Sequence, residues 1–219
     1  KKGQWLIYNG PVEHVKTGEW EKYGVPVSLS PDATKKCFLK IVNDTVKEIP
    51  VDVVVPVLHG AWGEDGTIQG LLEMAQIPYV GCGVLASAVS MDKTLTKLVA
   101  DNAHIPQAAW QLVNSRDLAT RMDWVIRKIE ERFSYPVFVK PAGTGSSVGV
   151  SKAADREKLE EALHFAGKYD TKILVEEFIH GREVEVAVLG NENPVASICG
   201  EIDSGAEFYD YDAKYVTDT

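Results

Sequence analysis

The 219-residue sequence has few cysteines, no excess of positive charge and no long apolar run. Cys37, Cys82 and Cys199 lie far apart without C-x-x-C spacing, so we expect free thiols in a reducing cytoplasm. The formal charge of −9 argues against non-specific nucleic-acid binding, although it allows a local basic pocket. No apolar run approaches the roughly 18 residues of a membrane span, and no signal peptide is visible. We therefore expect a cytoplasmic protein with neither nucleic acid nor membrane as a partner.

The composition is that of an ordinary globular protein, with 45% hydrophobic and 25% charged residues. The length allows one large domain or two small ones. No internal repeat or low-complexity segment is visible.

A glycine-rich segment within residues 135–152, YPVFVKPAGTGSSVGVSK, is the most informative part of the sequence. Residues 137–139 predict a buried strand, which Lys140 ends and which Pro141 should not simply continue. Residues 143–149 then contain three glycines and two serines. A lysine at a strand end beside such a turn suits phosphate binding, because backbone N–H groups and hydroxyls can approach the oxygens. The alternative is an ordinary flexible hairpin loop.

This loop does not match two common nucleotide motifs. No Lys-Ser or Lys-Thr pair follows the last glycine, which excludes a Walker A motif. Gly143, Gly145 and Gly149 are spaced G-x-G-x-x-x-G and a strand is predicted to follow, which excludes the Rossmann fingerprint. If the loop binds phosphate, a different nucleotide fold is needed.

The first 88 residues predict a βαβ pattern. Residues 4–8 and 38–42 read as strands separated by turn-rich polar sequence. Residues 51–57, VDVVVPV, predict a strand buried on both faces of a parallel sheet. A helix from Thr67 to Ala75 and a short strand over 77–81 follow. The pattern is that of a Rossmann-like domain.

Two groups in the loop between this strand and helix have open alternatives. His59 is either a buried histidine bonded to backbone or a functional residue, because loops at the ends of such strands often bind ligands. Glu64, Asp65 and Gly66 either supply turn and cap chemistry for the helix or take part in a site.

The remainder alternates helices and strands. Asp92 is a plausible helix cap, and Lys93 in the first turn opposes the helix dipole, which favours either an anionic ligand or a solvated lysine. Helices are predicted over 117–132 and 155–168. The strand over 172–179 could hold an adenine, and residues 181–189 alternate as a half-buried strand. Residues 208–215 predict a covering loop.

In order and spacing, five stretches together resemble the D-alanine–D-alanine ligase family of the ATP-grasp superfamily. They are HGAWGEDGTIQG, ASAVSMDKTLTK, FVKPAGTGSSVGVSK, ILVEEFIHGREVEVAVLG and FYDYDAKY. The resemblance implies an α/β fold with a Rossmann-like N-terminal domain (1–88), a central ATP-grasp α+β domain (89–189) and the start of a C-terminal domain (190–219). Both ends of the family pattern are expected outside these 219 residues.

The implied activity is an ATP-dependent ligation for peptidoglycan precursor synthesis. One D-alanine carboxylate is phosphorylated, and the amine of a second D-alanine attacks the acyl phosphate. A D-alanine–D-serine ligase, another ATP-grasp ligase and a non-catalytic nucleotide-binding module are the alternatives. The resemblance also suggests a homodimer.

The resemblance further implies which residues bind ATP. Lysines would contact phosphates, loop residues would cap them, glutamates and an isoleucine backbone would meet adenine or ribose, and phenylalanines would flank the base. These residues are Lys93, Lys140, Gly145, Ser147, Val148, Glu176, Glu177, Phe178, Ile179, Glu183, Phe208 and Lys214.

Three residues are assigned to the reacting groups on the same basis. His59 would lie by the second substrate's carboxylate, and Ser146 and Tyr215 would close and orient the site. No metal ligand is assigned here, because the magnesium-binding acids are expected beyond Thr219. We therefore expect residues 1–219 alone to be inactive in ligation.

Overall fold

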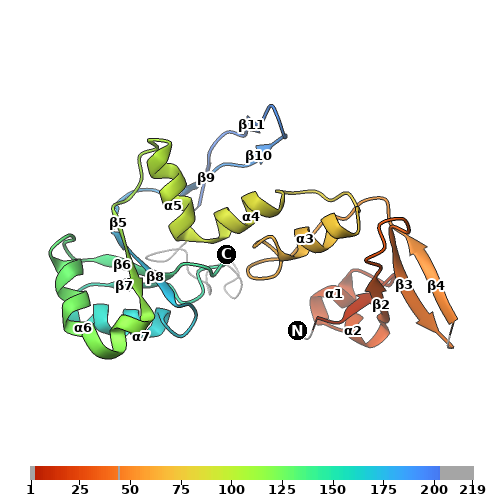
Figure 1. The fold of residues 1–219 in the computed structure, drawn as a ribbon, viewed down its shortest axis with the longest axis horizontal. Helices are drawn as coiled ribbons and strands as arrows, with labels where there is room; N and C mark the ends of the chain where they lie inside the picture. Colours follow the sequence, from red (N-terminus) through yellow and green to blue (C-terminus); the bar gives the residue numbers. More distant parts are fainter. Residues whose placement is uncertain (1–2, 44, 203–219) are drawn as a thin grey trace. The chain divides into compact units, whose positions relative to one another are not determined.

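The computed structural model describes residues 3–43 and 45–202. The chain divides into a first unit of residues 1–58 and 62–88 and a second unit of residues 59–61 and 89–219 (Figure 1). Both units contain helices and strands, which confirms the mixed character of the fold. The three predicted domain ranges stay a prediction.

The first unit is built on a four-stranded antiparallel sheet in the order β1-β2-β3-β4. Its strands are β1 (Trp5–Ile7), β2 (Val25–Leu29), β3 (Cys37–Val42) and β4 (Thr45–Pro50). Two short helices, α1 (Glu13–Thr17) and α2 (Trp20–Tyr23), connect β1 to β2. The strands predicted over 4–8 and 38–42 are confirmed. The segment between them, predicted as turns, also contains α1, α2 and β2.

The predicted buried strand over 51–57 is not present as a strand. Val54 forms an isolated parallel bridge with Tyr79. In the sequence, α3 (Thr67–Met74) lies between these two residues. Val53, Val55 and Val57 are 54%, 62% and 78% exposed. A strand buried on both faces needs neighbouring strands along its whole length. Among the described residues, residues 51–57 form a bridge at only one position, Val54. The strand predicted over 77–81 is likewise reduced to this one bridge, at Tyr79. A Rossmann-like domain therefore stays a prediction.

The second unit contains a four-stranded antiparallel sheet in the order β5-β8-β6-β7 (Figure 1). Its strands are β5 (Trp110–Asn114), β6 (Val137–Pro141), β7 (Ser151–Ala153) and β8 (Lys172–Glu177). The helices of this part are α4 (Val84–Met91), which crosses the unit boundary, α5 (Lys93–Asn102), α6 (Ser115–Glu130) and α7 (Arg156–Ala166). Asp92 caps α5, and the helices predicted over 117–132 and 155–168 are confirmed as α6 and α7.

The two faces of this sheet differ. Val137, Val139, Ile173 and Val175 are buried in one core with the apolar sides of α6 and α7. Because side chains alternate along a strand, Phe138, Lys140 and Glu176 lie on the other face. The helices therefore supply the hydrophobic stabilisation, and the opposite face carries charged groups.

Pro141 is the last residue of β6, where the sequence predicts that the strand has already ended. It pairs with Ile173 of β8, whereas β7 pairs only with residues 137–139. Beyond Val139 the strand has one neighbour in the described sheet, so the missing proline N–H costs no ladder bond on the β7 side.

Residues 181–189 do not form the single half-buried strand that their alternation predicts. They contain two short strands, β9 (Val184–Glu185) and β10 (Val188–Leu189). β9 pairs with β12 (Gly200–Glu201), and β10 pairs with β11 (Val195–Ala196). Val184 and Val188 are 54% and 66% exposed. Within residues 3–43 and 45–202, no layer covers this apolar side, so the pattern alone does not produce burial.

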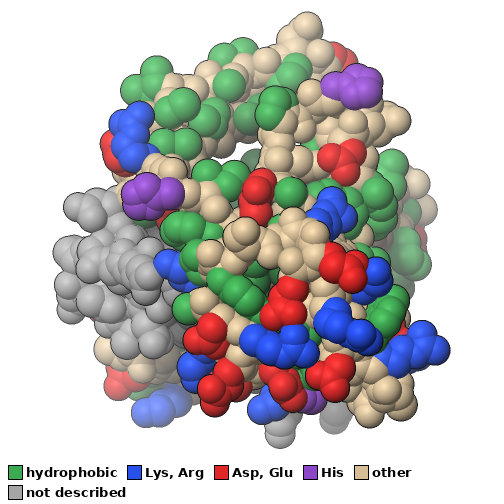
Figure 2. Space-filling view, turned by 90° about the vertical axis from the view of Figure 1, so that its left-hand side faces the viewer, with side chains coloured by type: hydrophobic (Ala, Val, Ile, Leu, Met, Phe, Trp, Pro, Cys, Tyr) green, Lys and Arg blue, Asp and Glu red, His purple; other side chains and the backbone are tan. Residues whose placement is uncertain are grey.

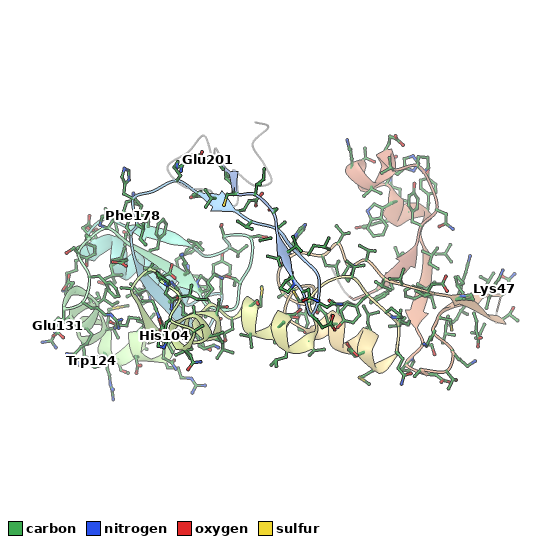
Figure 3. The ribbon with its side chains drawn as sticks, turned by 90° about the horizontal axis from the view of Figure 1, so that it is seen from above. Lys47, His104, Trp124, Glu131, Phe178 and Glu201 are labelled. Carbon is green, nitrogen blue, oxygen red and sulfur yellow. The ribbon has the colours of Figure 1, made fainter. Side chains whose placement is uncertain are left out.

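The outer surface of α6 and α7 is charged. Arg156 bonds Glu130 at 2.6 Å and Asp123 at 3.2 Å. On the face shown in Figure 2, basic and acidic side chains are interspersed. Trp124 is 47% exposed on α6 (Figure 3). No described helix is both long and apolar enough to cross a membrane.

Candidate active site

The glycine loop, residues 143–149, connects β6 to β7 and lines a cavity of about 440 Å³. Residues 59–61, which belong to the same unit, line it as well. The lining residues are His59, Gly60, Ala61, Gly143, Thr144, Gly145, Ser146 and Val148. The structure thus brings four predicted site residues together, namely His59, Gly145, Ser146 and Val148, although they come from two distant parts of the sequence.

The loop backbone adopts conformations that side chains rarely take. Ser146 and Ser147 have φ angles of 51° and 57°, in the left-handed region. Such backbone strain concentrates at functional sites, where the surrounding structure maintains it. Gly149 has a φ of 76°, and a Cβ there would lie 2.6 Å from Cγ of Pro141 and 2.7 Å from Cδ2 of Tyr169. Gly149 is therefore needed for both its conformation and its close packing.

Gly149→Ala is expected to lower the free energy of unfolding by about 2–4 kcal/mol, because strain and overpacking add. Gly181→Ala is the matched control, since a Cβ there meets nothing within 4 Å and its φ lies outside the left-handed region. Denaturant unfolding of both variants measures the difference. Equal stabilities would mean that the loop does not adopt this packed arrangement.

Two predicted cations lie at the base of the loop. Lys93 is the first residue of α5, and its Nζ donates to the carbonyl oxygen of Thr144. Its backbone N–H donates to the Ala142 carbonyl at 3.0 Å. Burial lowers the pKa of Lys93, and the nearby charge of Lys140 lowers it further. Two close cations repel each other, so an anion bound between them and the loop would be stabilised.

Glu176 holds one of these cations. Its carboxylate accepts from Lys140 and, at 2.8 Å, from Lys97, and its side chain is 9% exposed. Burial acts to raise the pKa of Glu176, but the two lysines outweigh burial and hold that pKa below its usual range. The Glu177 carboxylate accepts from the Ala109 N–H at 2.7 Å. Both carboxylates therefore have protein donors, and their adenine contacts stay predictions.

Lys97 is a residue that the sequence interpretation missed. It lies one turn after Lys93 on α5, and its side chain is 14% exposed. Its Nζ also donates to the Ala108 carbonyl at 3.3 Å. The i, i+4 spacing from Lys93 places both lysines on one side of the helix, which is the signal that could have found it.

An aromatic group lies past the end of β8. The rings of Phe178 and Phe138 are 5.9 Å apart, and Nζ of Lys152 is 4.2 Å from the Phe178 centroid. This places Phe178 (labelled in Figure 3) beside the first residues of β6, and its role in flanking the base stays a prediction. Ile179 is 62% exposed. Glu183 follows in the chain before β9, and Phe208, Lys214 and Tyr215 lie outside the described residues.

Comparison with known proteins identifies the family of the chain. Residues 1–82 match the family model described as D-ala D-ala ligase N-terminus, and residues 99–219 match that of the D-ala D-ala ligase C-terminus. The chain is 53% identical to the D-alanine–D-alanine ligase of Acetivibrio thermocellus, covering 100% of this chain and 62% of that protein. It is 51% identical to the D-alanine–D-alanine ligase of Caldicellulosiruptor bescii, covering 99% of this chain and 59% of that protein.

Solved structures show the same similarity. The VanG D-Ala:D-Ser ligase from Enterococcus faecalis is 36% identical, with a TM-score of 0.83 over 98% of this chain and 61% of that one. The D-alanine–D-alanine ligase from Coxiella burnetii is 34% identical, with a TM-score of 0.76 over 91% of this chain and 58% of that one. The chain spans about three-fifths of the length of the curated relatives it matches. With both family models matched in order along it, the chain belongs to the D-alanine–D-alanine ligase family.

Proposed function

We propose that this chain provides the ATP site and part of the substrate site of a ligase that joins two D-alanines for cell-wall peptidoglycan synthesis. The observation that carries the proposal is the grouping of Lys93 and Lys140 at the base of the glycine loop. In a member of this family, that grouping is best explained as a place for the phosphates of ATP.

The proposed reaction has two steps. A carboxylate oxygen of the first D-alanine attacks the γ-phosphorus of ATP, and ADP leaves. The amine nitrogen of the second D-alanine then attacks the acyl carbon, phosphate leaves, and the nitrogen loses a proton. The lysines would offset charge on the phosphates, while His59 and Ser146, which line the same cavity, would orient the amino acids. Tyr215 and Lys214 keep their predicted roles.

The described residues include candidate ligands for the phosphates of ATP. The lysines and the loop backbone are typical phosphate ligands. Within residues 3–43 and 45–202, no group of three or more His, Cys, Asp or Glu could hold a metal ion. Magnesium, when bound, would neutralise negative charge on the phosphates in such a transfer. We propose that its ligands lie beyond Thr219, and we expect residues 1–219 alone not to catalyse ligation.

Other proposals extend the family assignment. The parallel bridge between Val54 and Tyr79, with α3 between them, supports a Rossmann-like N-terminal domain. The resemblance suggests a homodimer, and the unpaired spacing of the cysteines supports a cytoplasmic location. Light scattering of the full-length protein tests the dimer.

The function is tested by ATP-dependent phosphate release in the full-length protein that contains this chain. We expect release with magnesium and D-alanine, together with formation of D-alanyl-D-alanine. D-serine is the second candidate for the attacking amino acid, because the VanG structure is that of a D-Ala:D-Ser ligase. A mixed dipeptide as main product would support that reading. Nucleotide binding without phosphate release would indicate a binding module instead.

A further inference from the structure

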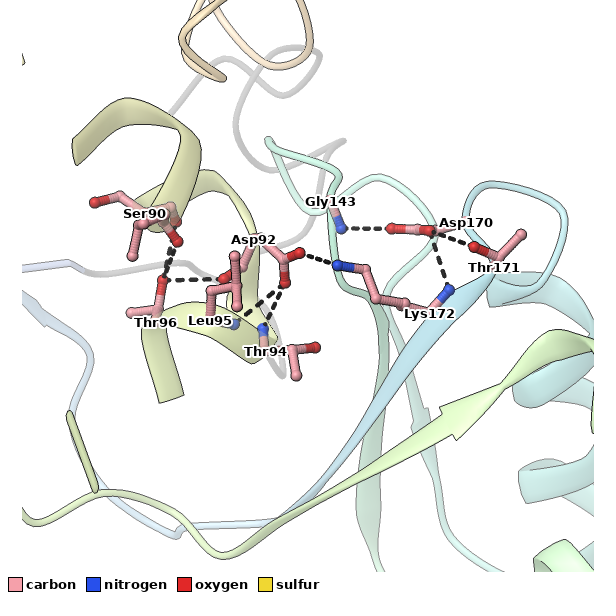
Figure 4. A network of polar contacts seen from close by, with 10 residues as sticks. Ser90, Asp92, Thr94, Leu95, Thr96, Gly143, Asp170, Thr171 and Lys172 are labelled. Atoms are coloured by element: carbon pink, nitrogen blue, oxygen red, sulfur yellow. Dashed lines mark hydrogen bonds and ion pairs between the residues drawn. The ribbon is translucent and has the colours of Figure 1, made fainter. Parts of the chain in front are cut away.

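Asp170 joins the start of the glycine loop to the start of β8 (Figure 4). Its Oδ2 accepts from the Gly143 N–H at 2.7 Å, and its Oδ1 accepts from the Lys172 N–H at 3.0 Å. The preceding residue, Tyr169, packs against Gly149 at the other end of the loop. The two-residue segment Tyr169–Asp170 therefore contacts both ends of the loop.

A second set of contacts connects this segment to α5. The Lys172 ammonium pairs with Oδ2 of Asp92, whose Oδ1 accepts from the N–H groups of Thr94 and Leu95 (Figure 4). Burial acts to raise the pKa of Asp92, but Lys172 and these N–H groups hold that pKa below its usual range. One carboxylate thus caps the helix and fixes the lysine at the start of β8.

Backbone bonds complete the connection. Ala142, just before the loop, donates its N–H to the Lys172 carbonyl at 2.9 Å and accepts from the Lys93 N–H at 3.0 Å. The beginning of α5, the end of β6 and the beginning of β8 therefore meet around the loop entrance. Neither Asp170 nor Lys172 lines the cavity.

We propose that Asp170 is a positioning residue for phosphate binding. It holds the first turn of the glycine loop at a fixed place relative to Lys93, and the Asp92–Lys172 pair supports it. The proposal rests on the proposed ATP site. A loop with two left-handed serines needs such support, because the surrounding structure must maintain strained backbone.

A positioning role and a purely electrostatic role of Asp170 predict opposite changes in ATP binding when its carboxylate is removed. Asp170 is a negative charge close enough to Lys93 to act on its pKa. On charge alone, its removal should strengthen the binding of an anion. If Asp170 acts by holding the loop, its removal should weaken ATP binding, because the loop must then be ordered when ATP binds.

The test uses the full-length protein with Asp170→Ala and Asp170→Asn. We expect Asp170→Ala to raise the KM for ATP about fivefold to tenfold and to change kcat less than twofold. Without nucleotide, the amides of residues 143–149 should exchange hydrogen faster. Asp170→Asn keeps one acceptor oxygen but no charge. Its KM for ATP and its loop exchange rate should therefore lie between those of wild type and Asp170→Ala. It carries the test alone if the alanine variant does not fold.

Asp155→Ala is the matched control. The Asp155 carboxylate accepts from the Lys158 N–H at 2.9 Å and caps α7, beyond the opposite end of β6. The Asp155→Ala substitution should lower the stability of the protein without changing the KM for ATP or the amide hydrogen exchange of residues 143–149.

Three outcomes would overturn the proposal: unchanged or tighter ATP binding in Asp170→Ala, unchanged loop exchange, or an equal rise of KM in Asp155→Ala. Faster loop exchange in Asp170→Ala of a protein that binds no ATP would instead refute the proposed function and leave the loop support standing.

Discussion

Glu176→Gln is expected to lower the free energy of unfolding by about 3 kcal/mol, the lower end for breaking a buried ion pair. The amide keeps the size of the side chain but leaves Lys97 and Lys140 facing a neutral group. Their side chains are 14% and 26% exposed, so water only partly compensates. Denaturant unfolding at neutral pH measures the loss.

The pH dependence provides a second check. Because the folded-state pKa of Glu176 is lowered, its contribution is present above its unfolded pKa of about 4.3 and is lost as pH falls through the folded value. The stability difference between wild type and Glu176→Gln should therefore shrink below about pH 4. Glu161→Gln, in an exposed pair with Lys158, should cost less than about 0.5 kcal/mol. Similar losses for both variants would contradict the buried cluster.

Lys140→Met in the full-length protein should weaken ATP binding by about 1.5–3 kcal/mol, or roughly 10- to 150-fold in Kd. Methionine keeps an apolar stem of similar length and removes the charge. The proposed loss is that of a charge-assisted contact with phosphate at the end of β6. Calorimetric titration with ATP measures it.

Lys97→Met is the control for this variant. Lys97 also pairs with Glu176, so both substitutions should reduce stability. Of these two lysines only Lys140 is assigned to phosphate, so ATP affinity should fall further in Lys140→Met than in Lys97→Met. Equal affinities in the two folded variants would remove Lys140 from the phosphate site.

The sequence predicts elements whose signal is local. Apolar periodicity predicts the helices α6 and α7, and in the structure Val125, Ile129, Leu159 and Leu163 on their apolar sides are all buried. Asp92 is a correctly predicted cap because capping involves only the next three residues.

The sequence predicts less where the outcome depends on distant partners. Residues 51–57 and 181–189 have strand patterns, but a pattern does not provide the neighbouring strand or the covering layer. In the candidate site, the pairing of Lys97 with Glu176 joins residues almost 80 positions apart, and that of Asp170 with Gly143 joins residues 27 apart. No local rule links such pairs. Their types are visible in the sequence, whereas their proximity is a property of the sheet.

The alternation along β6 has a consequence for changes in chain length. Val139 points into the core and Lys140 onto the charged face, one residue apart. Inserting or deleting a single residue within β6 would exchange the faces of these two side chains, placing an ammonium among apolar side chains and leaving a valine in place of the lysine that pairs with Glu176. Such a change would damage folding and ligand binding together. Natural insertions and deletions should therefore be excluded within this strand, even though every individual side chain would still be present.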